Sequence, residues 1–265
     1  MSIQKSKSSL GILLVTLLAI IMVVELSGKI FYETGLIHLL AAIYVVLALT
    51  RFFKPPKITD PILKKFVTAC LIALLVFVAS HLAEFIGFKF FGEYQDATFA
   101  NVANLFIVSL LLILMGVEFI FRARKERGPG ILILLGVLIF AALTLFTAFF
   151  VKGSLISLEP DKAAPYIYSG VVVLLALMAW LSVRRVRLQF PLLAGFGGRL
   201  MVGIILIILA IVPNTLYELL EDIFKMPEYQ IIYLAHFGFF AALTWMYLAF
   251  GEIRLGGVYE AVEKK

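Results

Sequence analysis

The chain has 265 residues, of which 63% are hydrophobic and only 15% are charged, and its mean hydropathy is +1.06. These values exclude an ordinary soluble domain, in which about half of the residues are apolar and about a quarter are charged. The net charge of +6 does not indicate a nucleic-acid partner, because the basic residues fall between apolar runs instead of forming one stripe or face.

The apolar runs are long enough to cross a bilayer, which takes about 20 residues for a helix. The first run, to about Leu26, is long for a signal peptide and lacks a small-residue cleavage pattern, so we interpret it as an uncleaved span. The sequence predicts an all-α, polytopic integral membrane protein, a single transmembrane domain over residues 1–265 with about eight spans. The predicted spans cover residues 10–28, 35–53, 62–90, 101–122, 130–151, 165–183, 198–224 and 229–250.

Most cationic residues fall at the two termini and in alternate connections between the predicted spans. They are Lys5, Lys7, Arg51, Lys54, Lys57, Lys64, Lys65, Arg122, Arg124, Lys125, Arg127, Arg184, Arg185, Arg187, Arg199, Arg254, Lys264 and Lys265. The opposite connections hold only Lys29, Lys89, Lys152, Lys162 and Lys225. By the positive-inside rule, this asymmetry predicts a protein of the cell membrane with both termini in the cytoplasm and four helical hairpins whose turns face outward.

Residues 79–95 and residues 213–230 carry related polar patterns. Each stretch ends an apolar run with two polar residues, two spacers and a glutamate, Glu84 in the first and Glu218 in the second, and then reaches Glu-Tyr-Gln. Their equivalent positions in two hairpins favour an internal repeat. The third hairpin departs from the pattern, and the sequence leaves open whether the repeat unit is one hairpin or two. The candidate units are residues 10–53, 62–122, 130–183 and 198–250.

Three glutamates, Glu25, Glu84 and Glu218, lie in the last turns of predicted helices that run outward. The C-terminal end of a helix is partially negative, so a carboxylate there is destabilised by roughly 0.3–1 kcal/mol. A bound cation would compensate; alternatively, the side chains simply reach solvent. By contrast, Glu93 precedes a predicted helix, where free backbone N–H groups stabilise a carboxylate. We therefore treat the first three as candidate cation ligands.

The three histidines, His38, His81 and His236, fall at similar depth in the outward half of their predicted spans. His81 and Glu84 are three residues apart and so share a helical face. Imidazole and carboxylate together suit Zn²⁺, Fe or Mn²⁺, whereas two histidines on different helices could ligate haem axially. For each histidine the structural alternative is a core position with its hydrogen bonds satisfied inside the protein.

Pro213 lies within the seventh predicted span. It removes one helical hydrogen bond, so we expect a kink beside Asn214 and Thr215. Broken helices with polar neighbours often line substrate sites in transporters, although purely structural kinks are equally common. Asn214 and Thr215 therefore join the candidate cation-binding residues.

Some polar and small residues have a structural interpretation. Glu118 and Glu252 are expected to pair within their own helices with Arg122 and Arg254. The glycines of residues 195–198 are expected to serve turns and close helix packing.

The sequence contains no glycine-rich phosphate loop and no His-Glu-x-x-His, Gly-x-Ser-x-Gly or Cys-x-x-Cys motif. No catalytic residue is predicted, which argues against an enzyme and against nucleotide-driven transport by this chain alone. The single cysteine, Cys70, cannot form an intramolecular disulfide, and we expect it to fill a small buried apolar position.

Two functional hypotheses follow. In the first, the protein binds or transports a cation, either a divalent metal ion or a proton-coupled solute, at an outward-facing polar site. In the second, it is a haem- or metal-binding redox or sensory protein with histidine ligands. The expected partners are the lipid bilayer and a small cation or solute, and the sequence leaves homo-oligomerisation open.

Overall fold

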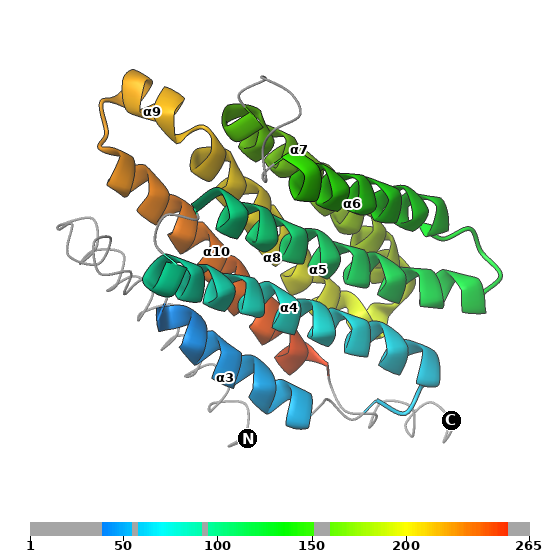
Figure 1. Ribbon diagram of the computed structural model, residues 1–265. Coiled ribbons are helices and arrows are strands. Elements are labelled where there is room, and N and C mark those ends of the chain that lie inside the picture. The colour runs from blue at the N-terminus through cyan, green and yellow to red at the C-terminus, as the bar shows by residue number, and fades with distance from the viewer. Residues whose placement is uncertain (1–38, 55–57, 92–94, 151–159, 254–265) are drawn as a thin grey trace, which may run out of the picture.

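A computed structural model describes residues 39–54, 58–91, 95–150 and 160–253 (Figure 1). These residues form helices and their connections, and no strand occurs among them. The elements are α3 (Leu39–Phe53), α4 (Pro61–Phe91), α5 (Gln95–Ala123), α6 (Gly130–Phe150), α7 (Pro160–Gln189), the 3-10 helix η2 (Pro191–Leu193), α8 (Ala194–Thr215), α9 (Tyr217–Phe224) and α10 (Glu228–Glu252). The predicted first span with Glu25, and also His38, lie outside the described residues.

Five of the described helices, α4, α5, α7, α8 and α10, are long and apolar enough to cross a membrane. Helix α6 adds a shorter apolar segment, Gly130–Leu145. The predicted spans 62–90, 101–122 and 229–250 lie within α4, α5 and α10. The all-helical class is therefore confirmed, and the five long apolar helices indicate a multi-pass membrane protein. The count of eight spans, the four hairpins and the internal repeat are not established by these residues.

Helices α4 and α5 run antiparallel and side by side (Figure 1). At Gly116 of α5, an added Cβ would lie 3.0 Å from side-chain atoms of both Ala69 and Phe66 of α4. Further along, the Ser109 hydroxyl donates a hydrogen bond of 2.8 Å to the carbonyl of Ala73. Small residues thus let the two backbones approach closely, as is typical of helix pairs in membranes.

Helices α8 and α10 form the second close antiparallel pair. A Cβ added at Gly203 would lie 2.6 Å from Cγ of Met246, and one added at Gly238 would lie 2.8 Å from Cβ of Ala210. Because a larger side chain at either glycine would push the backbones apart, these two contacts fix the register of α8 against α10.

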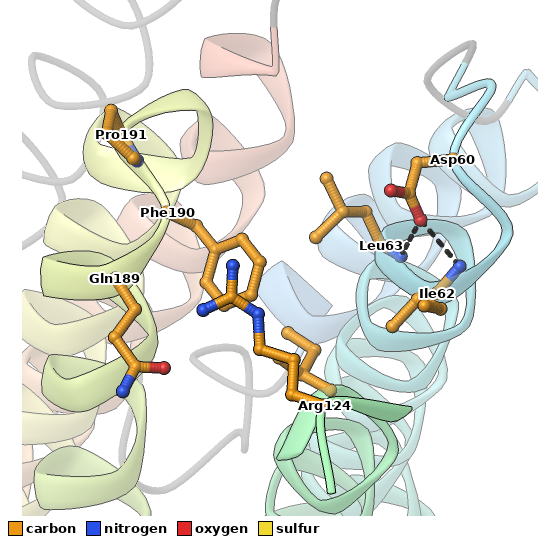
Figure 2. A pocket seen from close by; sticks show the side chains of 8 residues that line it. Asp60, Ile62, Leu63, Arg124, Gln189, Phe190 and Pro191 are labelled. Atoms are coloured by element: carbon orange, nitrogen blue, oxygen red, sulfur yellow. Dashed lines mark hydrogen bonds between the residues drawn. The ribbon is translucent and has the colours of Figure 1, made fainter. Parts of the chain in front are cut away.

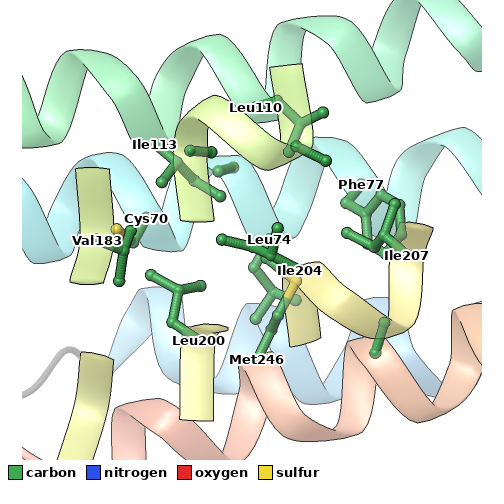
Figure 3. Packing of buried hydrophobic residues seen from close by; sticks show 14 of the residues in the cluster. Cys70, Leu74, Phe77, Leu110, Ile113, Val183, Leu200, Ile204, Ile207 and Met246 are labelled. Carbon is green, nitrogen blue, oxygen red and sulfur yellow. The ribbon is translucent and has the colours of Figure 1, made fainter. Parts of the chain in front are cut away.

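The core lies where α4, α5, α7, α8 and α10 meet (Figure 3). Leu74, Ile113 and Ile204 interdigitate there and are essentially inaccessible to solvent. Cys70 lies among them and is buried with a free thiol. Its predicted role as a small buried apolar residue is confirmed.

The outer surface of the bundle is strongly apolar on α6 and α7. On α6 the exposed fractions are 73% for Ile131, 59% for Leu134 and 56% for Leu138, and on α7 Leu181 is 57% exposed. A contiguous apolar surface of this kind is unfavourable in water. It indicates that this side of the bundle faces the hydrocarbon of a bilayer.

The seventh predicted span is not continuous: α8 ends at Thr215 and α9 begins at Tyr217. Between them Leu216 leaves helical geometry, with φ −103° and ψ 23°, while its N–H still donates to the carbonyl of Val212 at 3.0 Å. Pro213, in the last turn of α8, has no N–H and displaces the preceding turn. The predicted kink is therefore confirmed, but it is a full break, so the span predicted over residues 198–224 was too long.

The two ends of the bundle differ in charge. We call the end where α4, α6 and α8 begin the basic end, and the opposite end, where α4 and α8 finish and α10 begins, the far end (Figure 1). The cations at the basic end are Arg51, Lys54, Lys64, Lys65, Arg122, Arg124, Lys125, Arg127, Arg184, Arg185, Arg187 and Arg199. The segregation agrees with the sequence, and the cytoplasmic position of the basic end stays a prediction.

Candidate functional site

Three buried phenylalanines set the relative levels of α4, α5 and α10. The ring centroids of Phe77 and Phe106 are 4.6 Å apart, those of Phe106 and Phe239 5.3 Å, and those of Phe77 and Phe239 6.4 Å. We call this group the aromatic cluster. Because its members touch, residues at matched distances from them along each helix lie at the same level of the bundle.

A polar level follows directly on the far-end side of the aromatic cluster. Ser80 is three residues beyond Phe77, and His236 is three residues before Phe239, which places each about 4.5 Å from the cluster. Asn104 is two residues before Phe106. Helices α4, α5 and α10 therefore each bring a polar residue to one level.

Helix α7 adds a fourth polar residue. Leu111 of α5 and Leu175 of α7 both pack at Gly136, within 2.6 and 3.2 Å of the position of an added Cβ. Since α5 and α7 run in the same direction (Figure 1), Ser169, six residues before Leu175, lies at a level next to that of Asn104. We call Ser80, Asn104, Ser169 and His236 the polar layer.

The polar layer is rich in lone pairs. His236 is only 4% exposed, and its ring meets that of Phe239 edge to face at a centroid distance of 6.3 Å. The Ser80 hydroxyl donates to the carbonyl of Phe77 at 2.6 Å, which leaves its oxygen lone pairs available. The side-chain oxygen of Asn104 is buried and accepts no hydrogen bond from the described residues. Imidazole, amide oxygen and hydroxyl oxygen are groups that coordinate cations.

The break after α8 lies at the same level. Gly238 packs against Ala210, and α8 and α10 are antiparallel. His236, two residues before Gly238, therefore lies opposite Val212 and Pro213. The polar layer and the interrupted helix are thus neighbours in the fold.

The predicted site residues that lie in described helices divide into two groups. His236 is buried and belongs to the polar layer. His81 and Glu84 continue α4 beyond Ser80, and Asn214, Thr215 and Glu218 flank the break, but their side chains lie outside the described part. Among the side chains that are described, no three of His, Cys, Asp or Glu form a group that could hold a metal ion.

Sequence reasoning missed Asn104 and Ser169. Both are uncharged polar residues near the outward ends of the spans predicted over residues 101–122 and 165–183. An isolated polar residue at membrane depth is a functional signal in itself. Neither residue belongs to a motif, however, and only the packing of α5 and α7 places them at the level of His236.

Charged pairs occupy the basic end. The predicted pair of Glu118 with Arg122 is confirmed, at 3.6 Å. The Glu118 carboxylate also lies against Gly128 and Gly130, beside the N-terminus of α6, whose partial positive charge favours a carboxylate.

Glu252 has a described partner other than the predicted Arg254, and the pairing with Arg254 stays a prediction. Its carboxylate pairs with Arg199 of α8 at 2.6 Å, whereas Arg254 lies outside the described residues. An added Cβ at Gly195 would lie 3.1 Å from the same carboxylate, and one at Gly197 would lie 3.1 Å from Cβ of Arg187. The glycines of residues 195–198 therefore allow close packing, as predicted, and bring α8 next to Glu252.

Comparisons with known proteins give no match to a family model, a curated protein or a solved structure. The function is therefore inferred from the chemistry of the site itself.

Proposed function

We propose that this chain is a membrane protein of eight spans, with both termini in the cytoplasm, that binds and transports a cation through a site at the far end. The cation is a metal ion or a proton coupled to a solute. The observation that carries the proposal is the buried imidazole of His236 in a polar layer beside an interrupted helix. Ionisable side chains inside membrane spans are rare, and they commonly mark ion pathways and binding sites.

The electrostatics at this level favour a cation over an anion. Helix α8 ends at Thr215, and the C-terminal end of a helix carries a partial negative charge. Pro213 has no N–H to offer to the carbonyl of Leu209, so that oxygen is available to a ligand. Discontinuous helices bind cations in this way in transporters.

Access to the site is expected from the far end. On the other side of the polar layer, Phe77, Phe106 and Phe239 pack ring against ring and are almost fully buried. Below them the core is apolar and continues toward the basic end. A hydrated cation could not pass the aromatic cluster in this conformation, which supports an outward-facing state.

The proposed ligand set combines the polar layer with the acidic and polar residues predicted around it. Glu84 and Glu218 supply the negative charge that the polar layer lacks, and His81 adds a second imidazole on α4. The remaining proposed contributors are Glu25, His38, Asn214 and Thr215. If two of the histidines converge without the glutamates, haem or a redox metal becomes the bound group.

The experiment is elemental analysis of the purified chain, combined with a visible absorption spectrum and titration with Zn²⁺, Mn²⁺ and H⁺. We expect a stoichiometric cation or a titratable proton and no Soret band. A Soret band would replace the cation proposal with the haem alternative. Neither a metal nor a proton bound, and no Soret band, would leave the acids and histidines with structural roles only.

Glutamate variants locate the site. Glu84→Gln and Glu218→Gln each remove one charge and should weaken cation binding about tenfold or more, as loss of a ligand or of its supporting group does. Glu93→Gln is the matched control, because a carboxylate before a helix is stabilised without a cation. Equal affinities in all three variants would contradict the assignment of Glu84 and Glu218.

A further inference from the structure

A cavity of about 390 Å³ opens at the basic end, between the start of α4, the end of α5 and the end of α7 (Figure 2). Its walls are apolar at Ile62 and Leu63, and they also carry Arg124, Asp60 and Gln189. It lies far from the polar layer, at the opposite end of the same helices.

Arg124 is the cationic group of this pocket. Its guanidinium stacks on the ring of Phe190 at 4.2 Å (Figure 2), and its ion pair with Glu126 is long, at 3.9 Å. The other oxygen of Glu126 lies 3.3 Å from both Arg185 and Gln189. One carboxylate thus serves two arginines, so a positive charge remains on this side of the pocket. A planar guanidinium held on an aromatic face is suited to binding an oxyanion.

The other walls of the pocket carry hydrogen-bond acceptors. The side-chain oxygen of Gln189 is buried and accepts no hydrogen bond from the described residues. Asp60, across the pocket from Arg124 (Figure 2), uses one oxygen to accept from the N–H groups of Ile62 and Leu63 at 2.8 and 3.0 Å. A ligand that fills this pocket therefore needs an anionic group at Arg124 and a hydrogen-bond donor at Asp60, on the opposite wall (Figure 2).

The surroundings place the pocket at the headgroup level of a bilayer. At this end of the bundle, cationic side chains stack on aromatic rings, as Arg51 does on Tyr247 and Arg199 on Trp245. Such amphipathic pairs are typical of membrane interfaces, and basic pockets between helices on this side bind phosphorylated headgroups.

We propose that the pocket binds a phosphodiester whose far end donates hydrogen bonds, namely the ethanolamine or glycerol headgroup of a phospholipid. The phosphate lies on Arg124, and the ammonium or hydroxyl group donates to Asp60. A choline headgroup carries the same phosphate but has no donor, so it satisfies only half of the pocket.

The test measures lipid binding to the purified full-length chain by native mass spectrometry. Phosphatidylethanolamine, phosphatidylglycerol and phosphatidylcholine with identical acyl chains are titrated in turn. We expect the first two to bind about tenfold more tightly than the third, the ratio that one or two charge-assisted hydrogen bonds supply. Equal binding of all three lipids would overturn the proposal.

Variants separate the pocket from general surface charge. Arg124→Gln should weaken the binding of all three lipids, which share the phosphate, and Arg124→Lys should restore part of that binding. Arg122→Gln is the matched control: it removes the same charge two residues away, from a side chain that is 79% exposed and does not line the pocket. An equal loss in Arg122→Gln and Arg124→Gln would contradict the assignment, because only a diffuse field would then be acting.

A second experiment distinguishes a phospholipid headgroup from a soluble phosphoester of the same chemistry. Phosphoethanolamine and glycerol phosphate are added to the chain in phosphatidylcholine nanodiscs, and the unfolding temperature is measured. A lipid site predicts no shift at concentrations where the lipids bind. A shift that is lost in Arg124→Gln would assign the same pocket chemistry to a soluble phosphoester, whereas a shift that persists in this variant would exclude the pocket as the site.

Discussion

Polar side chains are arranged in opposite ways at the basic end and at the far end of this bundle. At the basic end the charges are paired or stacked at the surface, as Arg199 with Glu252 and Arg185 with Glu126. At the far end the polar layer combines serine, asparagine and histidine side chains, of which Ser80, Ser169 and His236 are buried. Surface pairs of the first kind contribute little to stability, whereas buried polar groups of the second kind are unfavourable without a partner.

This contrast indicates where function is concentrated. The positions of the interfacial arginines are explained by the positive-inside rule and by contact with lipid headgroups. His236 is instead a buried imidazole at the level of the break after Thr215, a position that the charge asymmetry of the two ends does not explain. Burial of polar groups, more than charge, therefore favours the far end as the candidate functional region.

The largest expected effect comes from the contact that sets the polar layer against the broken helix. Gly238→Val should force α10 away from Ala210, which an added Cβ would approach to 2.8 Å. Overpacking of this kind costs about 1–3 kcal/mol, and it should lower both the unfolding midpoint in detergent and the affinity for the cation. The control is Gly170→Val, since nothing lies within 4 Å of a Cβ at Gly170. Similar destabilisation by both variants would contradict the assigned register.

A smaller effect distinguishes the polar layer from the rest of the core. Ser80 and Ser109 are both buried and both donate to a backbone carbonyl, at 2.6 and 2.8 Å, but only Ser80 lies on the far-end side of the aromatic cluster. Replacing either serine with alanine should cost a similar 0.5–1.5 kcal/mol, by the order of magnitude of one hydrogen bond. Ser80→Ala should in addition weaken cation binding about two- to fivefold, by loss of one coordinating oxygen, while Ser109→Ala should leave it unchanged. Titration of both variants checks this, and an equal change in the two would remove Ser80 from the site.

The sequence predicted the helices well because their cause is local. Long apolar runs, bounded by charges and by Pro61, Gly130 and Pro160, can satisfy their backbone hydrogen bonds in a bilayer only as helices. The bounds of α4 and α10 therefore agree with the predicted spans to within a few residues. Pro213 likewise predicted a kink in its helix, because proline lacks the backbone N–H in any context.

The rest depended on packing between helices, which no local pattern encodes. The pairing of Glu252 with Arg199 needs α8 to pass close to α10, which the glycines near residue 195 allow. The level shared by Asn104 and His236 follows from contacts among phenylalanines on three helices. The sequence identified His236 as one of three candidates, and the fold supplied its neighbours.

The most direct measurement is sided labelling of the polar layer. Two variants are made in a chain carrying Cys70→Ala, one with a cysteine at position 104 and one with a cysteine at position 124, at the basic end. Each is treated with a small, membrane-impermeant thiol reagent, with and without the bound cation. We expect position 104 to be labelled only from outside the cell, and more slowly when the cation is present. Position 124 should be labelled only from the cytoplasm. Labelling of position 104 from the cytoplasmic side, or at a rate that the cation does not change, would contradict the proposed site.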